Sequence, residues 1–353
     1  MSQPDAVAQL EHLVHRFVSN GVPLADVEQI RSDLTDWSSW NQAWQRSGDA
    51  RMAEAEAADR AGAHQTAAEL RLVAALEFHF GKFLFVHDVV ALRRGTERAA
   101  GAYRRALVRL PWPGRVLDVP YRDRTLPGVF RTPAAGGPAP TVLLVPGLDA
   151  AKEELHLLSE VFLRRGMATM VVDGPGQGES EFDLPLTAEW EEVAEAVLDV
   201  LRGRHEVDRA RVGVVGVSLG GHYAARTAAR ADGIRAGVSL GGCYSMGESW
   251  PHLKHLSRDA FRVRTRSSDM DAASAEADRF TLASAPARGG VPFLVVHGER
   301  DRLFDTEQAE RMAKHFGPDG ELTLEPDGNH VLHNIGYRIR PAAADWLRAR
   351  LDG

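Results

Sequence analysis

The stretch RVGVVGVSLGGHYAARTAAR (residues 211–230) joins a valine-rich run to an alanine-rich run through one serine. The valine-rich run is typical of a buried strand, and the alanine-rich run is typical of a helix that packs closely on its neighbours. Gly216, Ser218 and Gly220 form a G-x-S-x-G pattern between them. A strand that turns so sharply into a helix leaves no room for a Cβ at either glycine and lifts the serine hydroxyl above the sheet. We therefore predict that Ser218 is a nucleophile.

A nucleophilic serine needs a base, and the base needs an acid to orient it. In a sheet of this kind both follow later strands, in the order serine, acid, histidine. The segment HGERDRLF places Asp301 after the apolar run VPFLVVHG, and DGNHVLHN places His330 before the last expected helix. The sequence therefore predicts the catalytic triad Ser218, Asp301 and His330.

Other residues compete for two of these roles. Glu299 and Asp327 are alternatives for the acid, and His333 is an alternative for the base, although it would lie in or beside the following helix. His297, within HGERD, fits a hydrogen-bonding turn better than a catalytic role.

The oxyanion of an acyl-transfer intermediate needs two backbone N–H donors. We expect one from Leu219, which follows the nucleophile, and one from the loop VPGLDAAKEE, where Leu148 is the candidate and Asp149 the alternative. The glycine-rich segment DGPGQGES (173–180) does not match a nucleotide-binding pattern, so we interpret it as a tight turn at the rim of the site.

The rest of the chain has two parts. Residues 1–112 have helical periodicity, including a helix pair that turns near Gly62, and predict an all-helical, cap-like N-terminal domain. From residue 113 to 353, apolar strands alternate with helices, which predicts an α/β catalytic domain with a mostly parallel sheet flanked by helices. Residues 244–290 interrupt this alternation and are expected to form an insertion at the rim.

Composition narrows the class of protein. The chain has 353 residues, a net charge of −7 and one cysteine, Cys243. These values give no reason to expect nucleic-acid binding, an internal disulfide or a cysteine-rich metal site. Neither a signal peptide at MSQPDAVAQLEH nor a membrane span is apparent, so we expect a cytoplasmic protein without membrane association.

The motifs PGLDAAKEE, DGPGQGES, GVSLGG, HGERD and DGNH together resemble those of the α/β-hydrolase superfamily. More narrowly, the chain resembles the carbon–carbon bond hydrolases around 2,6-dihydroxypseudooxynicotine hydrolase, which carry a helical N-terminal domain. The resemblance implies the same triad, no metal or cofactor, and a small-molecule substrate cleaved next to a ketone or deacylated. It also suggests an acidic pocket residue, here Glu248 in GGCYSMGESW; a solvated glutamate at the rim is the alternative.

The helical part is expected to form one wall of the substrate pocket. The segment EFHFGKFLF matches the resemblance best, so His79 and Phe83 are candidate substrate-binding residues. The tryptophans at 37, 40 and 44 share one helical face and fit helix packing. A structural or homodimerisation role for the helical part stays open. So do three other functions for the whole chain: a carboxylesterase, an acyltransferase and a non-catalytic binding protein.

Overall fold

The computed structural model describes residues 5–133 and 136–353. The first four residues of the segment examined for a signal peptide lie outside this description. The chain divides into two compact units. One comprises Met1–Arg115 with Glu153–Leu157, and the other comprises Val116–Lys152 with Leu158–Gly353. The sequence did not predict that residues 153–157 would pack with the helices.

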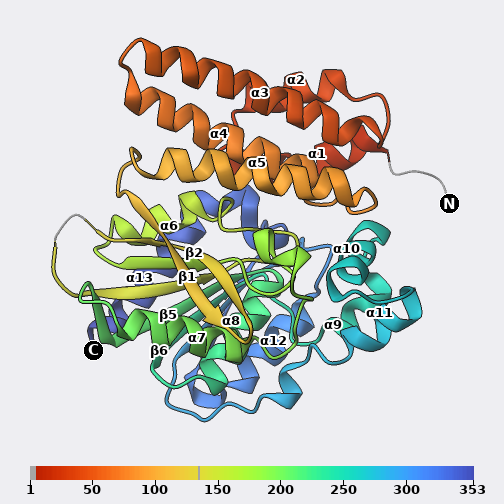
Figure 1. Cartoon of the computed structure of the whole chain (residues 1–353). Coiled ribbons are helices and arrows are strands. Elements are labelled where there is room, and N and C mark those ends of the chain that lie inside the picture. The colour runs from red at the N-terminus through yellow and green to blue at the C-terminus, as the bar shows by residue number, and fades with distance from the viewer. Residues whose placement is uncertain (1–4, 134–135) are drawn as a thin grey trace. The chain divides into compact units, whose positions relative to one another are not determined.

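The helical unit is an arrangement of long helices joined by short turns (Figure 1). The expected helix pair is present: α3 (Ser39–Arg60) and α4 (His64–Lys82) pack extensively against each other. The turn between them contains Gly62, whose φ of +79° suits glycine. The helices are α1 (Ala6–Ser19), α2 (Leu24–Asp33), α3 (Ser39–Arg60), α4 (His64–Lys82) and α5 (Val89–Leu107).

Aromatic rings fill the core of the helical unit. Trp40 and Trp44, on one face of α3, are completely buried, and so are Phe17 and Phe80 from α1 and α4. The Phe17 ring meets the Trp44 and Phe80 rings edge-on with centroids 4.8 Å apart, a geometry that aromatic pairs favour. The tryptophan stripe is therefore a packing stripe, as the sequence indicated.

The second unit is built on a sheet that has eight strands within the described residues, in the order β1-β2-β4-β3-β5-β6-β7-β8. β2 pairs antiparallel with β4, and the pairs from β4 through β8 are parallel. The strands are β1 (Gly114–Tyr121), β2 (Arg124–Arg131), β3 (Ala139–Val145), β4 (Ala168–Val172), β5 (Val207–Val217), β6 (Ile234–Leu240), β7 (Phe293–Gly298) and β8 (Gly320–Glu325).

Helices pack on this sheet through their apolar faces. α8 lies against β5 and β6, α12 against β7 and β8, and α13 against β5 and β6. Every residue of β3 is buried, as a continuously apolar strand requires when both faces of the sheet are covered. The helices are α6 (His156–Leu163), α7 (Trp190–Arg202), α8 (Leu219–Arg230), α9 (Met246–Ser249), α10 (His255–Thr265), α11 (Met270–Ala277), α12 (Thr306–His315) and α13 (Gly336–Asp352).

The fold is the predicted α/β-hydrolase fold with a helical N-terminal region. Between β6 and β7 the chain forms α9, α10 and α11, so helices occupy the segment where the strand–helix alternation is interrupted. An isolated antiparallel β-bridge joins Ser245, just before α9, to Thr281, shortly after α11. Among the described residues, no helix combines the length and apolar character that crossing a membrane requires.

Candidate active site

Ser218 occupies the turn between β5 and α8 in a strained conformation. Its φ is 55° and its ψ is −125°, a region that residues with a Cβ rarely adopt. The turn tolerates no side chain at its flanking glycines, since a Cβ on Gly216 would lie 1.8 Å from the Gly220 carbonyl oxygen. A Cβ on Gly220 would lie 2.1 Å from the Val145 carbonyl oxygen at the end of β3. The G-x-S-x-G glycines thus allow the helix to start directly behind the serine.

The imidazole of His330 lies between a hydroxyl and a carboxylate. Its Nε2 is 2.9 Å from Ser218 Oγ, and its Nδ1 is 2.7 Å from Asp301 Oδ2. Ser218 follows β5, Asp301 follows β7 and His330 follows β8, so three parallel strands of one sheet bring the three side chains to the same edge. The His330 side chain is 22% exposed, whereas that of Asp301 is 1% exposed. The histidine is therefore open to a substrate and the carboxylate is sealed.

Hydrogen bonds fix the Asp301 carboxylate. Its Oδ1 accepts the backbone N–H groups of Leu303 at 2.8 Å and Phe304 at 3.2 Å. Burial raises the pKa of Asp301, but the positive charge and hydrogen bond of His330 outweigh burial, and the net pKa is lowered. The carboxyl is thus an ionised acceptor for the Nδ1–H of His330.

The alternative acid and base residues lie elsewhere. Glu299 is exposed, and Asp327 is exposed and paired with Arg300. The ring of His333 contacts a guanidinium on α13. His297 is buried and hydrogen-bonded to a backbone carbonyl 3.0 Å away, and burial lowers its pKa. The structure therefore brings Asp301 and His330, rather than these residues, to Ser218.

The two residues expected to supply oxyanion donors lie directly after the serine and in the loop that follows β3. Leu219 is the first residue of α8, and Leu148 belongs to the loop that follows β3. The backbone before Leu148 runs against Ser218, because a Cβ built on Gly147 would be 3.2 Å from Ser218 Cβ and 3.1 Å from the Val217 carbonyl oxygen. The missing side chain at Gly147 thus lets this loop approach the serine.

Glu248 lies on α9 and forms an ion pair. Arg311 on α12 donates to both of its carboxylate oxygens, and Gln308 Nε2 donates to Oε2 at 3.3 Å. Its side chain is 47% exposed. The hydrogen bond from Arg311 lowers the pKa of Glu248, so the carboxylate is charged and already paired.

His79 and Phe83 lie in the core of the helical unit. Both are completely buried. His79 Nε2 is 2.9 Å from Glu154 Oε2, and Arg16 Nε donates to Glu154 Oε1 at 2.7 Å. Burial raises the pKa of Glu154, but the charge and hydrogen bond of Arg16 outweigh it, and the net pKa is lowered. Sequence reasoning missed Glu154, because nothing local links it to a histidine 75 residues earlier.

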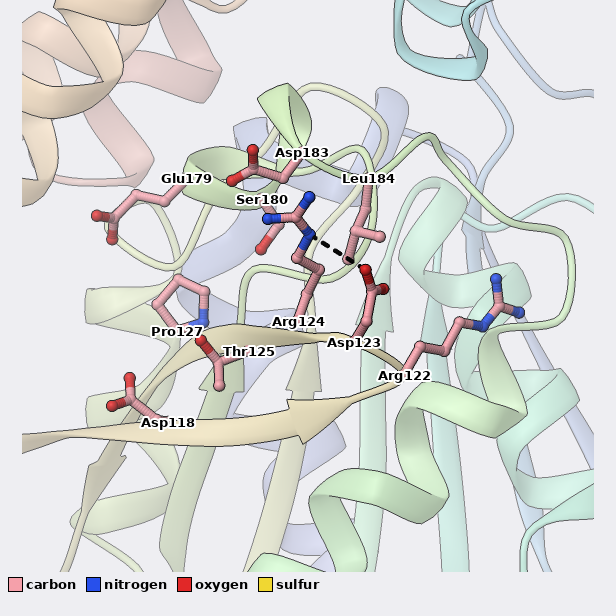
Figure 2. A pocket seen from close by; sticks show the side chains of 10 residues that line it. All are labelled: Asp118, Arg122, Asp123, Arg124, Thr125, Pro127, Glu179, Ser180, Asp183 and Leu184. Carbon is pink, nitrogen blue, oxygen red and sulfur yellow. Dashed lines mark ion pairs between the residues drawn. The ribbon is translucent and has the colours of Figure 1, made fainter.

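A polar groove of about 680 Å³ opens beside the turn between β1 and β2 (Figure 2). Ser218, Asp301 and His330 are not among the residues that line it, so this groove is separate from the candidate active site. Its walls carry charges of both signs, and Arg124 pairs with Asp123. The lining residues are Asp118, Arg122, Asp123, Arg124, Thr125, Pro127, Glu179, Ser180, Asp183 and Leu184.

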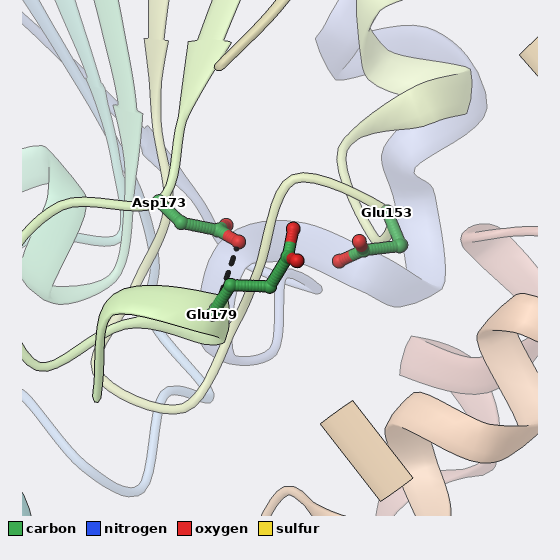
Figure 3. A group of neighbouring side chains, drawn as sticks. All are labelled: Glu153, Asp173 and Glu179. Carbon is green, nitrogen blue, oxygen red and sulfur yellow. Dashed lines mark hydrogen bonds between the residues drawn. The ribbon is translucent and has the colours of Figure 1, made fainter. Parts of the chain in front are cut away.

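Two carboxylates in the loops beside the site share a lysine. Asp173 and Glu179 lie close together after β4 (Figure 3), and Lys152 Nζ lies 2.7 Å from a carboxylate oxygen of each. Asp173 and Lys152 are buried. An ammonium group therefore already supplies the positive charge between these carboxylates.

The chain was compared with known proteins. The family model described as Esterase FrsA-like matches residues 12–351. The 2,6-dihydropseudooxynicotine hydrolase of Paenarthrobacter nicotinovorans is 29% identical over 341 residues, which cover 94% of this chain and 90% of that protein. The α/β hydrolase xenA of Xenoacremonium sinensis is 30% identical over 242 residues, covering 63% of this chain and 57% of that protein.

A solved structure is also similar over nearly the whole chain. The crystal structure of the 2,6-dihydroxy-pseudo-oxynicotine hydrolase superposes with a TM-score of 0.87 at 28% identity, covering 96% of this chain and 95% of that one. The similarity to this group of hydrolases predicted from the sequence motifs is thereby confirmed. With the family model matched almost from end to end, the chain belongs to the FrsA-like esterase family and is an α/β-hydrolase enzyme.

Proposed function

We propose that the chain is a serine hydrolase whose nucleophile is Ser218, whose general base is His330 and whose orienting acid is Asp301. The observation that carries this proposal is the imidazole that reaches Ser218 Oγ at 2.9 Å with one nitrogen and Asp301 Oδ2 at 2.7 Å with the other. This spacing is the one that proton transfer from a serine hydroxyl requires.

In the first step, Ser218 Oγ adds to a substrate carbonyl carbon while His330 Nε2 accepts the hydroxyl proton. The negative charge moves to the carbonyl oxygen, where the N–H groups of Leu148 and Leu219 stabilise it. Asp301 holds the other ring nitrogen protonated and balances the positive charge of the imidazolium. The intermediate then collapses, the bond to the leaving group breaks, and the leaving group takes its proton from His330.

In the second step, water attacks the acyl-serine while His330 accepts its proton. His330 then returns this proton to Ser218 Oγ as the bond between Oγ and the acyl carbon breaks, and the carboxylic acid leaves. An ester releases an alcohol in the first step. A ketone releases a carbanion, which needs an electron-withdrawing neighbour because it is a much poorer leaving group.

We propose such an activated ketone, or an acyl group on an aromatic or polyketide-like molecule, as the substrate. Support comes from the hydrolase of P. nicotinovorans, whose name specifies a pseudooxynicotine substrate.

Ester hydrolysis is the second candidate, favoured by the esterase family to which the chain belongs. A panel of activated aryl ketones, β-diketones and aryl esters separates the two. We expect the ratio of kcat/KM to favour a ketone once the substrate's shape is matched. Turnover of esters alone across the panel would assign the chain as a carboxylesterase.

The nucleophile is tested with a fluorophosphonate probe and the variant Ser218→Ala. We expect the wild-type protein to be labelled once per chain at Ser218, and the variant to lose both labelling and about 10⁴-fold or more of kcat while it keeps its melting temperature. Near-native turnover by a folded Ser218→Ala variant would refute the proposal.

A further inference from the structure

The segment DGPGQGES folds into a tight turn between β4 and the 3₁₀ turn η1 (Gly178–Phe182). Gly178 has a φ of +47°, and a Cβ there would lie 2.1 Å from Asp173 Oδ2. The Asp173 carboxylate accepts the backbone N–H groups of Lys152 at 2.8 Å and Glu179 at 3.1 Å. The turn is thus fastened to the end of the loop that follows β3, which also carries the expected oxyanion donor.

Gln177 points from this turn into the same loop. It is completely buried. Its Nε2 donates to the carbonyl oxygens of Pro146 and Gly147, both at 2.8 Å, and its Oε1 accepts the Gly174 N–H at 3.2 Å. Exchanging the amide oxygen and nitrogen would set an oxygen against two carbonyls and an NH₂ group against an N–H. The network therefore fixes the amide orientation, and both amide hydrogens are used.

The contact with Gly147 determines where the next N–H points. The Gly147–Leu148 peptide bond is trans, so its C=O and its N–H point in opposite directions within one plane. A donor that holds the Gly147 oxygen therefore fixes the direction of the Leu148 N–H. The same applies to the Pro146 oxygen and the Gly147 N–H. Gly147 adjoins the nucleophile, since its Cβ would be 3.7 Å from Ser218 Oγ.

We propose that Gln177 is a positioning residue for the oxyanion hole: its amide holds the Gly147–Leu148 peptide in the orientation that points the Leu148 N–H at the oxyanion. This inference rests on the proposed serine mechanism. Gln177 does not touch the substrate. It acts by preventing this peptide from rotating, and a preorganised donor is worth more in catalysis than one that must be reoriented during the reaction.

The test is the variant Gln177→Met, which keeps the length of the side chain and removes both donors. Removing one oxyanion donor outright costs about 10²–10³ in kcat, so loosening one should cost about 10- to 100-fold. We expect this loss in kcat with an aryl ester, a KM within about threefold of wild type, and an equal loss in the affinity of a boronic acid that mimics the tetrahedral intermediate.

Ser180→Ala is the matched control. Ser180 lies in the same turn and is buried, but its hydroxyl donates to the Asp173 carbonyl oxygen at 2.9 Å rather than to a carbonyl of residues 146–148. We expect it to lower the melting temperature comparably while kcat stays within about threefold of wild type. A wild-type kcat for Gln177→Met, or an equal loss of kcat in Ser180→Ala, would overturn the inference.

Gln177→Glu gives a second readout and serves if the methionine variant does not fold. Its ionised carboxylate would face two carbonyl oxygens, whereas its protonated form can donate to one of them. We therefore expect the ratio of variant to wild-type kcat to rise as the pH falls, and a flat ratio would contradict the proposal. Failure of the serine mechanism itself is recognised separately, because Ser218→Ala would then remain active in the otherwise wild-type chain.

Discussion

Asp301 Oδ2 lies 2.7 Å from Nδ1 of His330, although 29 residues separate the two in the chain. The contact selects one tautomer of the histidine, with its proton on Nδ1, and leaves Nε2 free to accept the proton of Ser218. Because the Asp301 side chain is 1% exposed, water does not compete for this hydrogen bond. In the proposed mechanism, this hydrogen bond keeps the ring in the orientation that faces Ser218.

Asp301→Asn should lower kcat by about 10⁴-fold while the protein stays folded. The amide can donate a hydrogen bond to Nδ1, which favours the tautomer with its proton on Nε2, and this tautomer cannot accept the proton of Ser218. The measurement is kcat with an aryl ester, together with a melting curve. Glu299→Gln and Asp327→Asn are the controls, because both side chains are exposed. A larger loss in either control would move the acid assignment to that residue.

Glu77 makes the stability of the helical unit depend on pH. Burial, followed by the hydrogen bond and charge of Asp26, raises its pKa from 4.5 to about 9. Between pH 4.5 and about 9, the folded state therefore binds one more proton than the unfolded state. The free energy of unfolding thus falls as the pH rises through this range. Glu77→Gln should flatten this slope, by up to about 1.4 kcal/mol for each pH unit, and should raise the melting temperature at pH 8.

Glu69→Gln is the control for this prediction, because Glu69 lies on the same helix and is exposed. Chemical unfolding followed between pH 5 and pH 9 gives the slope for each protein. The glutamine at position 77 keeps an acceptor for Ser47 Oγ, which lies 2.9 Å from Glu77 Oε1 in the wild-type chain. Equal slopes for wild type and Glu77→Gln would contradict the raised pKa.

Phe83→Ala should act mainly on stability. The Phe83 ring is completely buried, and it meets the Phe80 ring edge-on with centroids 5.6 Å apart. Truncating a buried phenylalanine costs about 3–5 kcal/mol, which a denaturant titration measures. Val90→Ala, at an exposed position of α5, is the control and should change stability by less than about 0.5 kcal/mol. A stable Phe83→Ala variant with an altered KM would instead support the substrate-binding role suggested by the sequence.

Glu248→Gln and Arg311→Gln should have similar, small effects on kcat/KM, within about threefold of wild type. Arg311 donates a hydrogen bond to the Glu248 carboxylate, and this carboxylate is about half-exposed. An exposed ion pair has a small interaction energy, so removing either partner should disturb the neighbouring structure little. Steady-state kinetics of both variants with one ketone and one ester decide the matter. A large loss confined to Glu248→Gln would assign this carboxylate to the substrate.

The triad geometry was accessible from sequence because each of its residues follows an apolar strand. The carboxyl ends of parallel strands meet at one edge, so the position of Ser218, Asp301 and His330 after β5, β7 and β8 is enough to place them together. The strained turn at Ser218 was predictable for a different reason: it depends only on the two glycines that flank the serine in the sequence.

Contacts between distant segments were not predictable. Gln177 is recognised only by its bonds to backbone oxygens 30 and 31 residues earlier, which no sequence pattern records. His79 looked like a pocket residue, but its partner is Glu154, 75 residues later. Phe83 was likewise a candidate substrate-binding residue, and the structure buries its ring completely among helices of the same unit, which its residue type alone could not indicate.

The last prediction concerns the backbone of the turn at Ser218. Gly216→Ala would place a Cβ 1.8 Å from the Gly220 carbonyl oxygen, and this backbone atom cannot move without displacing the start of α8 and the Ser218 hydroxyl. We expect a loss of stability of about 3 kcal/mol or more and a loss of fluorophosphonate labelling in the folded fraction. The matched control is Gly101→Ala within α5, where a Cβ meets nothing within 4 Å. That variant should gain about 0.5–1 kcal/mol, because alanine favours a helix over glycine. If Gly216→Ala were as stable and as rapidly labelled as wild type, the close contact between β5 and α8 could not be what positions Ser218.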